Sequence, residues 1–181
     1  MRVLVAAFED VGGSRRPAGG LHRLDAVVEI AVRVPSGPVW ASVTLASADR
    51  FWTCAASHES ARQADEVQYA LASGPCVDAI LDDMVYHVRD VAHDPRWPAF
   101  ARAAARPPVA CMLSCPMVVM PVPGRDLRAS LNIYAGRRSA LDDEAVGFLL
   151  LLAAYGDLVA SVVEDARRRA RVRGFDFRGL L

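Results

Sequence analysis

The sequence has no lysine and no excess of charge of either sign. All 21 of its basic residues are arginine, and 21 acidic residues balance them, so the formal net charge at pH 7 is zero. Domains that bind a nucleic-acid backbone carry an excess of basic residues. We therefore expect no direct nucleic-acid partner. The exclusive use of arginine is typical of a GC-rich genome and indicates little about function.

Long apolar runs are also absent. The longest apolar stretch, residues 145–156, is too short to span a bilayer. The opening segment, residues 1–8, contains a six-residue apolar run, which is short for the core of a signal peptide. These features predict a cytoplasmic protein with no membrane partner.

No Cys-x-x-Cys pair occurs among the four cysteines, which are Cys54, Cys76, Cys111 and Cys115. In a chain without a signal peptide, this argues against both a disulfide scaffold and a zinc ribbon. The four histidines are scattered, and no two of them share the spacing expected of metal ligands. We predict free thiols, no metal site and no cofactor.

The 181 residues are 53% hydrophobic and 23% charged, which is enough to bury one sizeable core. Residues 12–20 combine glycine, proline and charge without an apolar period. We therefore predict a flexible tail over residues 1–20 and one domain over residues 21–165. Residues 166–181 are predicted to be an arginine-rich helix end and tail.

The apolar periodicity changes several times between helix and strand spacing. It predicts helices over residues 21–34, 59–72, 94–105 and from 142 onward, a short helix after Pro75, and strands over 39–45, 51–56, 84–91, 109–120 and 127–135. This order indicates an α+β fold with a central antiparallel sheet of about five or six strands and helices on both faces. The turn between the last two strands is expected at residues 123–126.

Three residues are predicted to mark helix ends. Gly74 should close the helix that begins at residue 59, since glycine is common just after a helix. Asp94 followed by Pro95 should be the N-cap of the next long helix. Asp142 should cap the last helix, with Leu141 and Val146 placed for a hydrophobic staple.

Several short motifs follow one another in a specific order. They are Asp65, Gln68, the Gly-Pro-Cys turn at 74–76, the DVAHDPRWPAF run at 90–100 and the LNIY run at 131–134. This succession resembles a GAF sensor domain, and the resemblance covers roughly residues 22–165. Within that family it is most similar to the actinobacterial subgroup that usually precedes an RNA-binding ANTAR domain.

The resemblance implies a PAS-related sheet with terminal helices on one face and a ligand cavity on the other. It also implies a non-enzymatic sensor that binds an unknown small molecule. The ANTAR domain that would follow is absent from residues 174–181. Any transcriptional output is therefore expected to pass through another protein.

The predicted ligand site lies between the sheet and the 94–105 helix. Trp97 and Phe100, three residues apart, should both face the sheet and form the lid of this site. The floor would carry Leu113, Asn132 and Tyr134. An aromatic pair at helical spacing is also typical of core packing, and a buried Asn132 could find its partners in neighbouring backbone instead. Both interpretations stay open.

Cys76 is the candidate redox residue. It follows Gly74 and Pro75 at the start of a short helix, where the helix dipole favours a thiolate. The alternative is a small packed side chain. Free methionine-R-sulfoxide reductases are also GAF proteins with reactive cysteines near this position, so a thiol-dependent reductase is an alternative function. It would require a second thiol, such as Cys111, near Cys76.

Cys111, Leu113 and Cys115 alternate along one predicted strand and should share one of its faces. A disulfide between the two cysteines is excluded, because four residues of strand span about 13 Å. Both cysteines are candidates for contact with a ligand. The other interpretation makes them substitutions within a core.

The last helix is apolar almost all round from residue 145 to residue 155. Such a helix needs a second partner besides its own sheet. We predict a homodimer through the terminal helices, and a domain that serves only for dimerisation without a ligand is a third hypothesis. The arginines of residues 167–173 suit the C-terminal end of a helix dipole.

Overall fold

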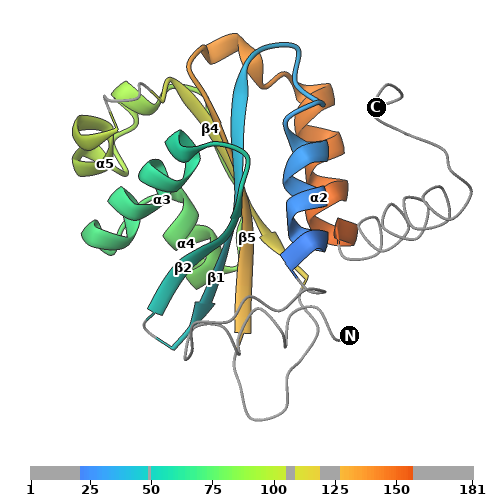
Figure 1. The fold of residues 1–181 in the computed structure, drawn as a ribbon. Helices are drawn as coiled ribbons and strands as arrows, with labels where there is room; N and C mark the ends of the chain where they lie inside the picture. The colour runs from blue at the N-terminus through green and yellow to red at the C-terminus, as the bar shows by residue number, and fades with distance from the viewer. Residues whose placement is uncertain (1–20, 49, 105–108, 119–126, 157–181) are drawn as a thin grey trace, which may run out of the picture.

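The computed structural model describes residues 21–48, 50–104, 109–118 and 127–156. The predicted tail at 1–20, the turn at 123–126 and the arginine-rich end at 166–181 lie outside these residues. Within them, a five-stranded antiparallel sheet forms the centre of the domain, and helices cover both of its faces (Figure 1). The α+β fold predicted from the sequence is confirmed.

The strands pair in the order β2-β1-β5-β4-β3. Their bounds are β1 Val39–Ser47, β2 Arg50–Ala56, β3 Tyr86–Val88, β4 Cys111–Met117 and β5 Leu127–Ala135. Consecutive strands β1 and β2, and β4 and β5, are paired antiparallel, as the alternating apolar patterns predict. The first strand also pairs with the last along its whole length, and this long-range pairing brings β1 and β5 together at the centre of the sheet.

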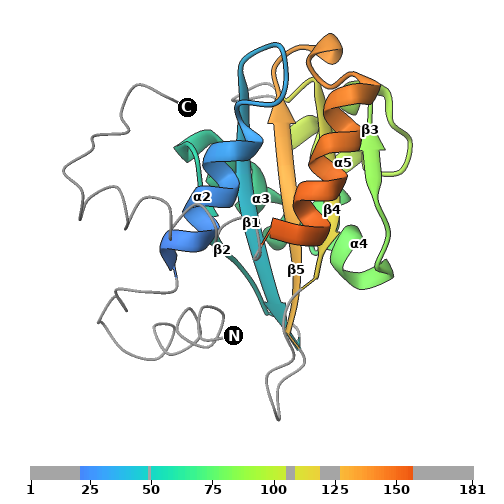
Figure 2. The same ribbon diagram turned by 90° about the vertical axis from the view of Figure 1, so that its right-hand side faces the viewer.

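One face of the sheet is covered by α2 (Leu21–Ala31) and by the unlabelled orange helix over residues 143–156, which lie side by side (Figure 2). The core on this face is apolar and includes Val27 and Val28 of α2 together with Leu131 and Ile133 of β5. The backbone N–H of Ala145 donates to Asp142 Oδ1 at 2.8 Å. The predicted N-cap of the last helix is therefore confirmed.

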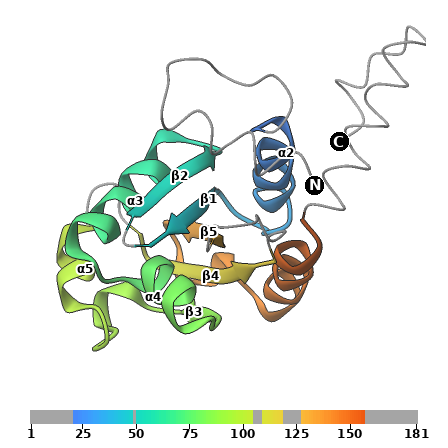
Figure 3. The same cartoon turned by 90° about the horizontal axis from the view of Figure 1, so that it is seen from below.

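The opposite face is covered by α3 (Glu59–Leu71), α4 (Pro75–Asp82) and α5 (Pro98–Ala103) (Figure 3). A short 3-10 turn, η1 (Val91–His93), leads toward α5, and a second one, η2 (Arg138–Ala140), precedes the last helix. A second, smaller apolar core lies on this face and includes Trp97, Phe100, Met112 and Tyr134.

Three local predictions were wrong. The 94–105 helix begins only at Pro98, because the Asp94 carboxylate accepts hydrogen bonds from the backbone and guanidinium of Arg96 and so holds an extended turn. The strand predicted over residues 84–91 is limited to β3. The helix that begins at residue 59 ends at Ala72, which adopts a left-handed conformation, and Gly74 instead precedes α4.

Among the described residues, no helix combines the length and apolar character needed to cross a membrane.

Gly74 has a role that requires glycine. Its φ of 147° lies in a region that other residues rarely adopt, and an added Cβ would lie 2.5 Å from both Cγ and Oε1 of Gln68. Gly37 is a useful comparison, because an added Cβ there meets only the Cβ of Ala140, at 3.7 Å.

We predict that Gly74→Ala lowers the free energy of unfolding by at least about 2 kcal/mol, because it adds backbone strain and displaces the Gln68 side chain. Gly37→Ala should change it by less than about 1 kcal/mol. Urea denaturation followed by circular dichroism measures both values. Equal stability of the two variants would contradict the role assigned to Gly74.

Candidate functional site

A group of polar side chains lies in the interior between the sheet and helices α3 and α4. We call it the polar cluster, and its members are all fully buried: Ser42, Thr44, Asp65, Gln68, Cys76, Ser114, Ser130, Asn132 and Tyr134. Burying so many polar groups is costly unless each finds a hydrogen-bond partner. The partners therefore decide what this site can do.

Asp65 of α3 is the acceptor at the centre of the polar cluster. Its carboxylate accepts hydrogen bonds from the hydroxyls of Ser42 at 3.0 Å, Thr53 at 2.7 Å and Tyr134, and the Asn132 amide nitrogen lies 3.4 Å away. No cation pairs with Asp65 among the described residues. Burial raises the pKa of Asp65 to about 6, although the hydroxyl donors oppose this shift.

Gln68 lies one turn further along α3 and connects three elements. Its Nε2 donates to Ala64 O at 3.1 Å and to Tyr134 Oη at 3.0 Å, and its Oε1 accepts the backbone N–H of Cys76 at 2.8 Å. The last bond caps an otherwise unpaired N–H at the start of α4. Hydrogen bonds therefore run from the start of α4 through Gln68 and Tyr134 to Asp65.

Asn132 and Ser114 are opposite each other on β5 and β4. The Asn132 amide nitrogen lies 3.0 Å from Thr44 Oγ1 and 3.3 Å from Cys76 Sγ, and its oxygen accepts from Ser130 at 3.1 Å. The hydroxyl of Ser114, in contrast, is buried and has no hydrogen-bond partner. The polar cluster is therefore almost completely satisfied, with one free hydroxyl on β4.

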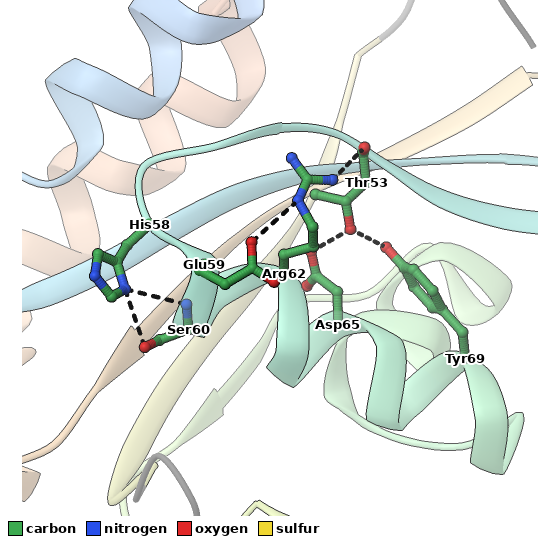
Figure 4. Close-up of polar contacts among 7 residues, drawn as sticks. All are labelled: Thr53, His58, Glu59, Ser60, Arg62, Asp65 and Tyr69. Carbon is green, nitrogen blue, oxygen red and sulfur yellow. Dashed lines mark hydrogen bonds and ion pairs between the residues drawn. The ribbon is translucent and has the colours of Figure 1, made fainter.

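The polar cluster extends to the edge of the sheet at β2. A bulge in the pairing of β1 with β2 places Thr53 directly opposite Thr44. Tyr69 shares hydrogen bonds with both, at 3.1 Å and 2.7 Å, and Figure 4 shows Thr53 between Asp65 and Tyr69. Arg62 is close by but contacts Thr53 O at 3.2 Å and Glu59 at 3.9 Å.

Cys76 lies at the second position of α4, as predicted, but its surroundings oppose a thiolate. Burial is the main cause that raises the pKa of its thiol, and the Asp65 charge adds to the rise. The sulfur lies 3.3 Å from Thr44 Oγ1 and 3.8 Å from Ser130 Oγ. In the described structure the burial of this thiol therefore outweighs the helix dipole.

The sheet separates the predicted site residues into two groups. Trp97, Phe100 and Tyr134 pack together on the α5 side, and Asn132 and Cys76 lie on the same face of the sheet. Cys111, Leu113 and Cys115 share the other face, in the apolar core beneath α2. The prediction of one floor carrying Leu113, Asn132 and Tyr134 was therefore wrong, because neighbouring strand residues alternate between faces.

The same separation applies to the cysteines. Cys54 also packs against the core beneath α2, and all four thiols are free. Burial raises the pKa of Cys54 and of Cys115 to about 12. In this structure Cys76 therefore has no second cysteine on its own face of the sheet.

Sequence reasoning named only part of the polar cluster. The motifs include Asp65 and Gln68 without predicting them as site residues, and they do not include the hydroxyl residues Ser42, Thr44, Ser114 and Ser130. The alternation of side chains along a strand could have indicated them, since Ser42 and Thr44, like Ser130 and Asn132, are two residues apart in strongly apolar strands.

The described residues contain no group of three or more His, Cys, Asp or Glu side chains placed to hold a metal ion.

Comparison with known protein families gives a match over most of the chain. A family model described as "GAF domain" matches residues 22–159. No curated protein sequence matches the chain.

Several solved structures share the fold at low sequence identity. The type II free methionine-R-sulfoxide reductase from Thermoplasma acidophilum aligns with a TM-score of 0.58 at 15% identity, covering 76% of this chain and 89% of that one. A domain described as part of a two-component sensor histidine kinase from Sinorhizobium meliloti gives 0.55 at 17% identity, covering 81% and 95%. The GAF domain region of a membrane protein from Geobacter sulfurreducens gives 0.54 at 10% identity, covering 89% and 97%. At these identities the similarity establishes the fold alone.

We predict that protonation of Asp65 stabilises the fold. Because burial raises the pKa of Asp65 from 3.8 to about 6, the folded state binds this proton more tightly than the unfolded state. The resulting stability is fully present below pH 3.8 and is lost as the pH rises through about 6. Relative to Asp65→Asn, which does not titrate, the natural protein should gain on the order of 1 kcal/mol between pH 7 and pH 5.

Urea denaturation of both proteins at the two pH values measures this difference, and other titrating groups cancel in the comparison. An identical change in the two proteins would show that Asp65 keeps its ordinary pKa in the folded state.

Proposed function

The chain belongs to the GAF domain family, and from this premise we propose that it is a cytoplasmic sensor domain that binds a small molecule at the polar cluster. The fold supports a sensor or regulatory domain. The ligand would bind on the face covered by α3, α4 and α5, between the sheet and the 94–105 segment. The narrower resemblance, to actinobacterial domains that precede ANTAR domains, stays a prediction from the sequence motifs.

One observation carries the proposal: the Ser114 hydroxyl is buried in the polar cluster without a partner. A buried hydroxyl that makes no hydrogen bond destabilises a fold by about 1–3 kcal/mol. An alanine would fill this position without that cost. A ligand group that bonds to Ser114 gives the hydroxyl a partner that the protein itself does not provide.

Asp65 indicates the chemistry of the ligand. Its buried carboxylate has donors but forms no ion pair among the described residues, and three of its four contacts involve Oδ1 while Oδ2 receives only Thr53. A carboxylate oxygen can accept two hydrogen bonds. We therefore favour a ligand with an N–H donor, best as an ammonium or guanidinium group, which would bond Oδ2 and neutralise the buried charge.

The experiment compares two serine variants. Ser114→Ala removes a hydroxyl without a partner, so it should leave the free energy of unfolding unchanged or raise it by about 1 kcal/mol, whereas Ser42→Ala removes a donor to Asp65 and should lower it by about 1–3 kcal/mol. Native and denaturing mass spectrometry of the cell-purified natural protein should show a small molecule that denaturation releases, and Ser114→Ala should retain less of it.

A natural protein that carries no extra mass, and that gains no thermal stability from a panel of amines and guanidinium compounds, would contradict ligand binding. That result would favour a module that serves only for dimerisation. The burial of Trp97 and Phe100 in the core fits such a module as well.

We further propose that the domain is a homodimer that passes its signal through the last helix to a partner protein. Phe148, Leu151 and Tyr155 lie on one side of this helix and are 49%, 61% and 59% exposed. Gly147 lies beside them with open space around it, so a second helix could approach closely. Apolar stripes of this kind mark protein interfaces.

Leu151→Glu should convert the dimer to a monomer, because it places a charge within the apolar stripe. Leu81→Glu on α4 is the matched control, since Leu81 is 51% exposed but lies on the opposite side of the sheet. Light scattering at micromolar concentration measures the mass. A natural protein with the mass of one chain, or a monomer caused equally by Leu81→Glu, would contradict this interface.

A thiol-dependent reductase or redox sensor acting through Cys76 is the second candidate function. The shared fold with the Thermoplasma acidophilum enzyme and the position of Cys76 in the polar cluster support it. The absence of a second cysteine on this face of the described structure counts against it. Reduction of free methionine-R-sulfoxide that is lost in Cys76→Ser would favour the reductase over the sensor.

A further inference from the structure

The segment that precedes α5 is hydrogen-bonded to α4 through side chains that are not part of the polar cluster. Trp97 donates its indole N–H to Asp78 Oδ2 at 2.5 Å, and Tyr86 of β3 donates its hydroxyl to Asp82 Oδ2 at 2.6 Å. The two aspartates are one turn apart on α4. We call the Trp97–Asp78 bond and the Tyr86 contacts beside it the latch.

Arg96 covers the latch from outside. Its guanidinium lies 4.3 Å from the centre of the Trp97 ring and 5.6 Å from that of Tyr86, and the two rings meet edge to face at 5.2 Å. Asp94 holds the guanidinium through bonds of 2.9 Å and 2.6 Å. A cation on two aromatic rings stabilises this arrangement even near the surface.

Tyr86, one part of the latch, lies beside the free hydroxyl of the polar cluster. Tyr86 is directly opposite Ser114 in the pairing of β3 with β4, and such neighbours have Cβ atoms about 5 Å apart. Trp97 and Phe100 also pack in one cluster with Tyr134, whose hydroxyl bonds Asp65. Movement of the 94–103 segment away from the sheet would uncover Tyr134, and loss of the Tyr86 contacts would uncover Ser114.

The segment has little stability of its own. Its helix, α5, has six residues, and an isolated helix of this length is unstable in water. It is held by the buried rings of Trp97 and Phe100 and by the latch. A hydrogen bond to a carboxylate is about twice as strong as one between neutral groups. The Trp97–Asp78 bond should therefore contribute much of the free energy that keeps this segment packed against α4.

We propose that residues 94–103, together with Tyr86, form a lid over the end of the polar cluster that carries Tyr134 and Ser114, and that the Trp97–Asp78 bond keeps this lid closed. The inference rests on the proposed function, because a lid has a role only if the polar cluster takes a ligand. The latch also connects the lid to the site, since α4 carries Asp78 and its first turn bonds Gln68 through Cys76. A ligand that shifts α4 would therefore weaken the latch, and an open lid would release α4.

Hydrogen exchange measured by mass spectrometry on the ligand-free protein tests the latch. Trp97→Phe keeps the buried ring and removes the N–H donor, and Trp40→Phe is the matched control, because Trp40 packs against the same apolar cluster. The amides of Ala101 and Ala104, which bond Trp97 O and Phe100 O, should exchange at least roughly tenfold faster in Trp97→Phe than in the control. Amides of α3 should exchange at the same rate in both.

Arg96→Gln is a second variant that leaves the core unchanged, because Arg96 is half exposed. It should accelerate the same amides several-fold through the loss of the ring contacts. Exchange in residues 98–104 that is no faster than in Trp40→Phe, or an equal acceleration of α3 and α5, would overturn the latch.

The outcomes for the latch and for the proposed function are separate. Hydrogen exchange is measured without a ligand. If it contradicts the latch, the native mass spectrometry of the natural protein still tests ligand binding independently. A lid that opens in Trp97→Phe while the natural protein binds nothing would contradict the proposed function and leave the latch intact.

Discussion

A buried carboxylate that forms no ion pair in the described structure is the constraint on which the arrangement of this domain depends. Asp65 is fully buried, and hydroxyl donors, with a further contribution from the Arg62 charge, offset the loss of its hydration. These donors come from β1, β2 and β5, so α3 can lie only where its carboxylate meets all three strands. Polar contacts therefore position this helix, whereas α2 on the other face is held by apolar packing.

Gln68 extends this constraint to α4. Its amide is held by Tyr134 and Ala64 and caps the start of α4, and the close approach of its side chain requires glycine at position 74. Polar groups in an interior of this kind destabilise the fold wherever they lack a hydrogen-bond partner. The polar cluster lies on one face of the sheet and leaves the Ser114 hydroxyl unpaired, which is the feature from which the ligand site is proposed.

Some features with a local cause were predicted from the sequence. The strands other than β3 followed from alternation, and the Asp142 cap followed from its position before an apolar run. The predicted start of α5 was wrong, because the Asp94 carboxylate accepts hydrogen bonds from Arg96 and does not cap a helix. Of the predicted ligand-contact residues, Cys76, Asn132 and Tyr134 lie in the polar cluster, whereas Leu113 faces the other core. The strand pattern gives no separate prediction for the serines and threonines of the cluster.

The amino-acid sequence alone dictates which side chains share a face of each strand, since side chains alternate with a period of two along any extended chain. This alternation is enough to separate Asn132 from Leu131 and Ile133. The contact of Asn132 with Asp65 and Cys76 depends instead on the tertiary structure. In the sequence, Asn132 is 67 positions from Asp65 and 56 positions from Cys76. The protonation of Asp65 and Cys76 also depends on it, because burial is a property of the packed domain and outweighs the local signals of helix and charge.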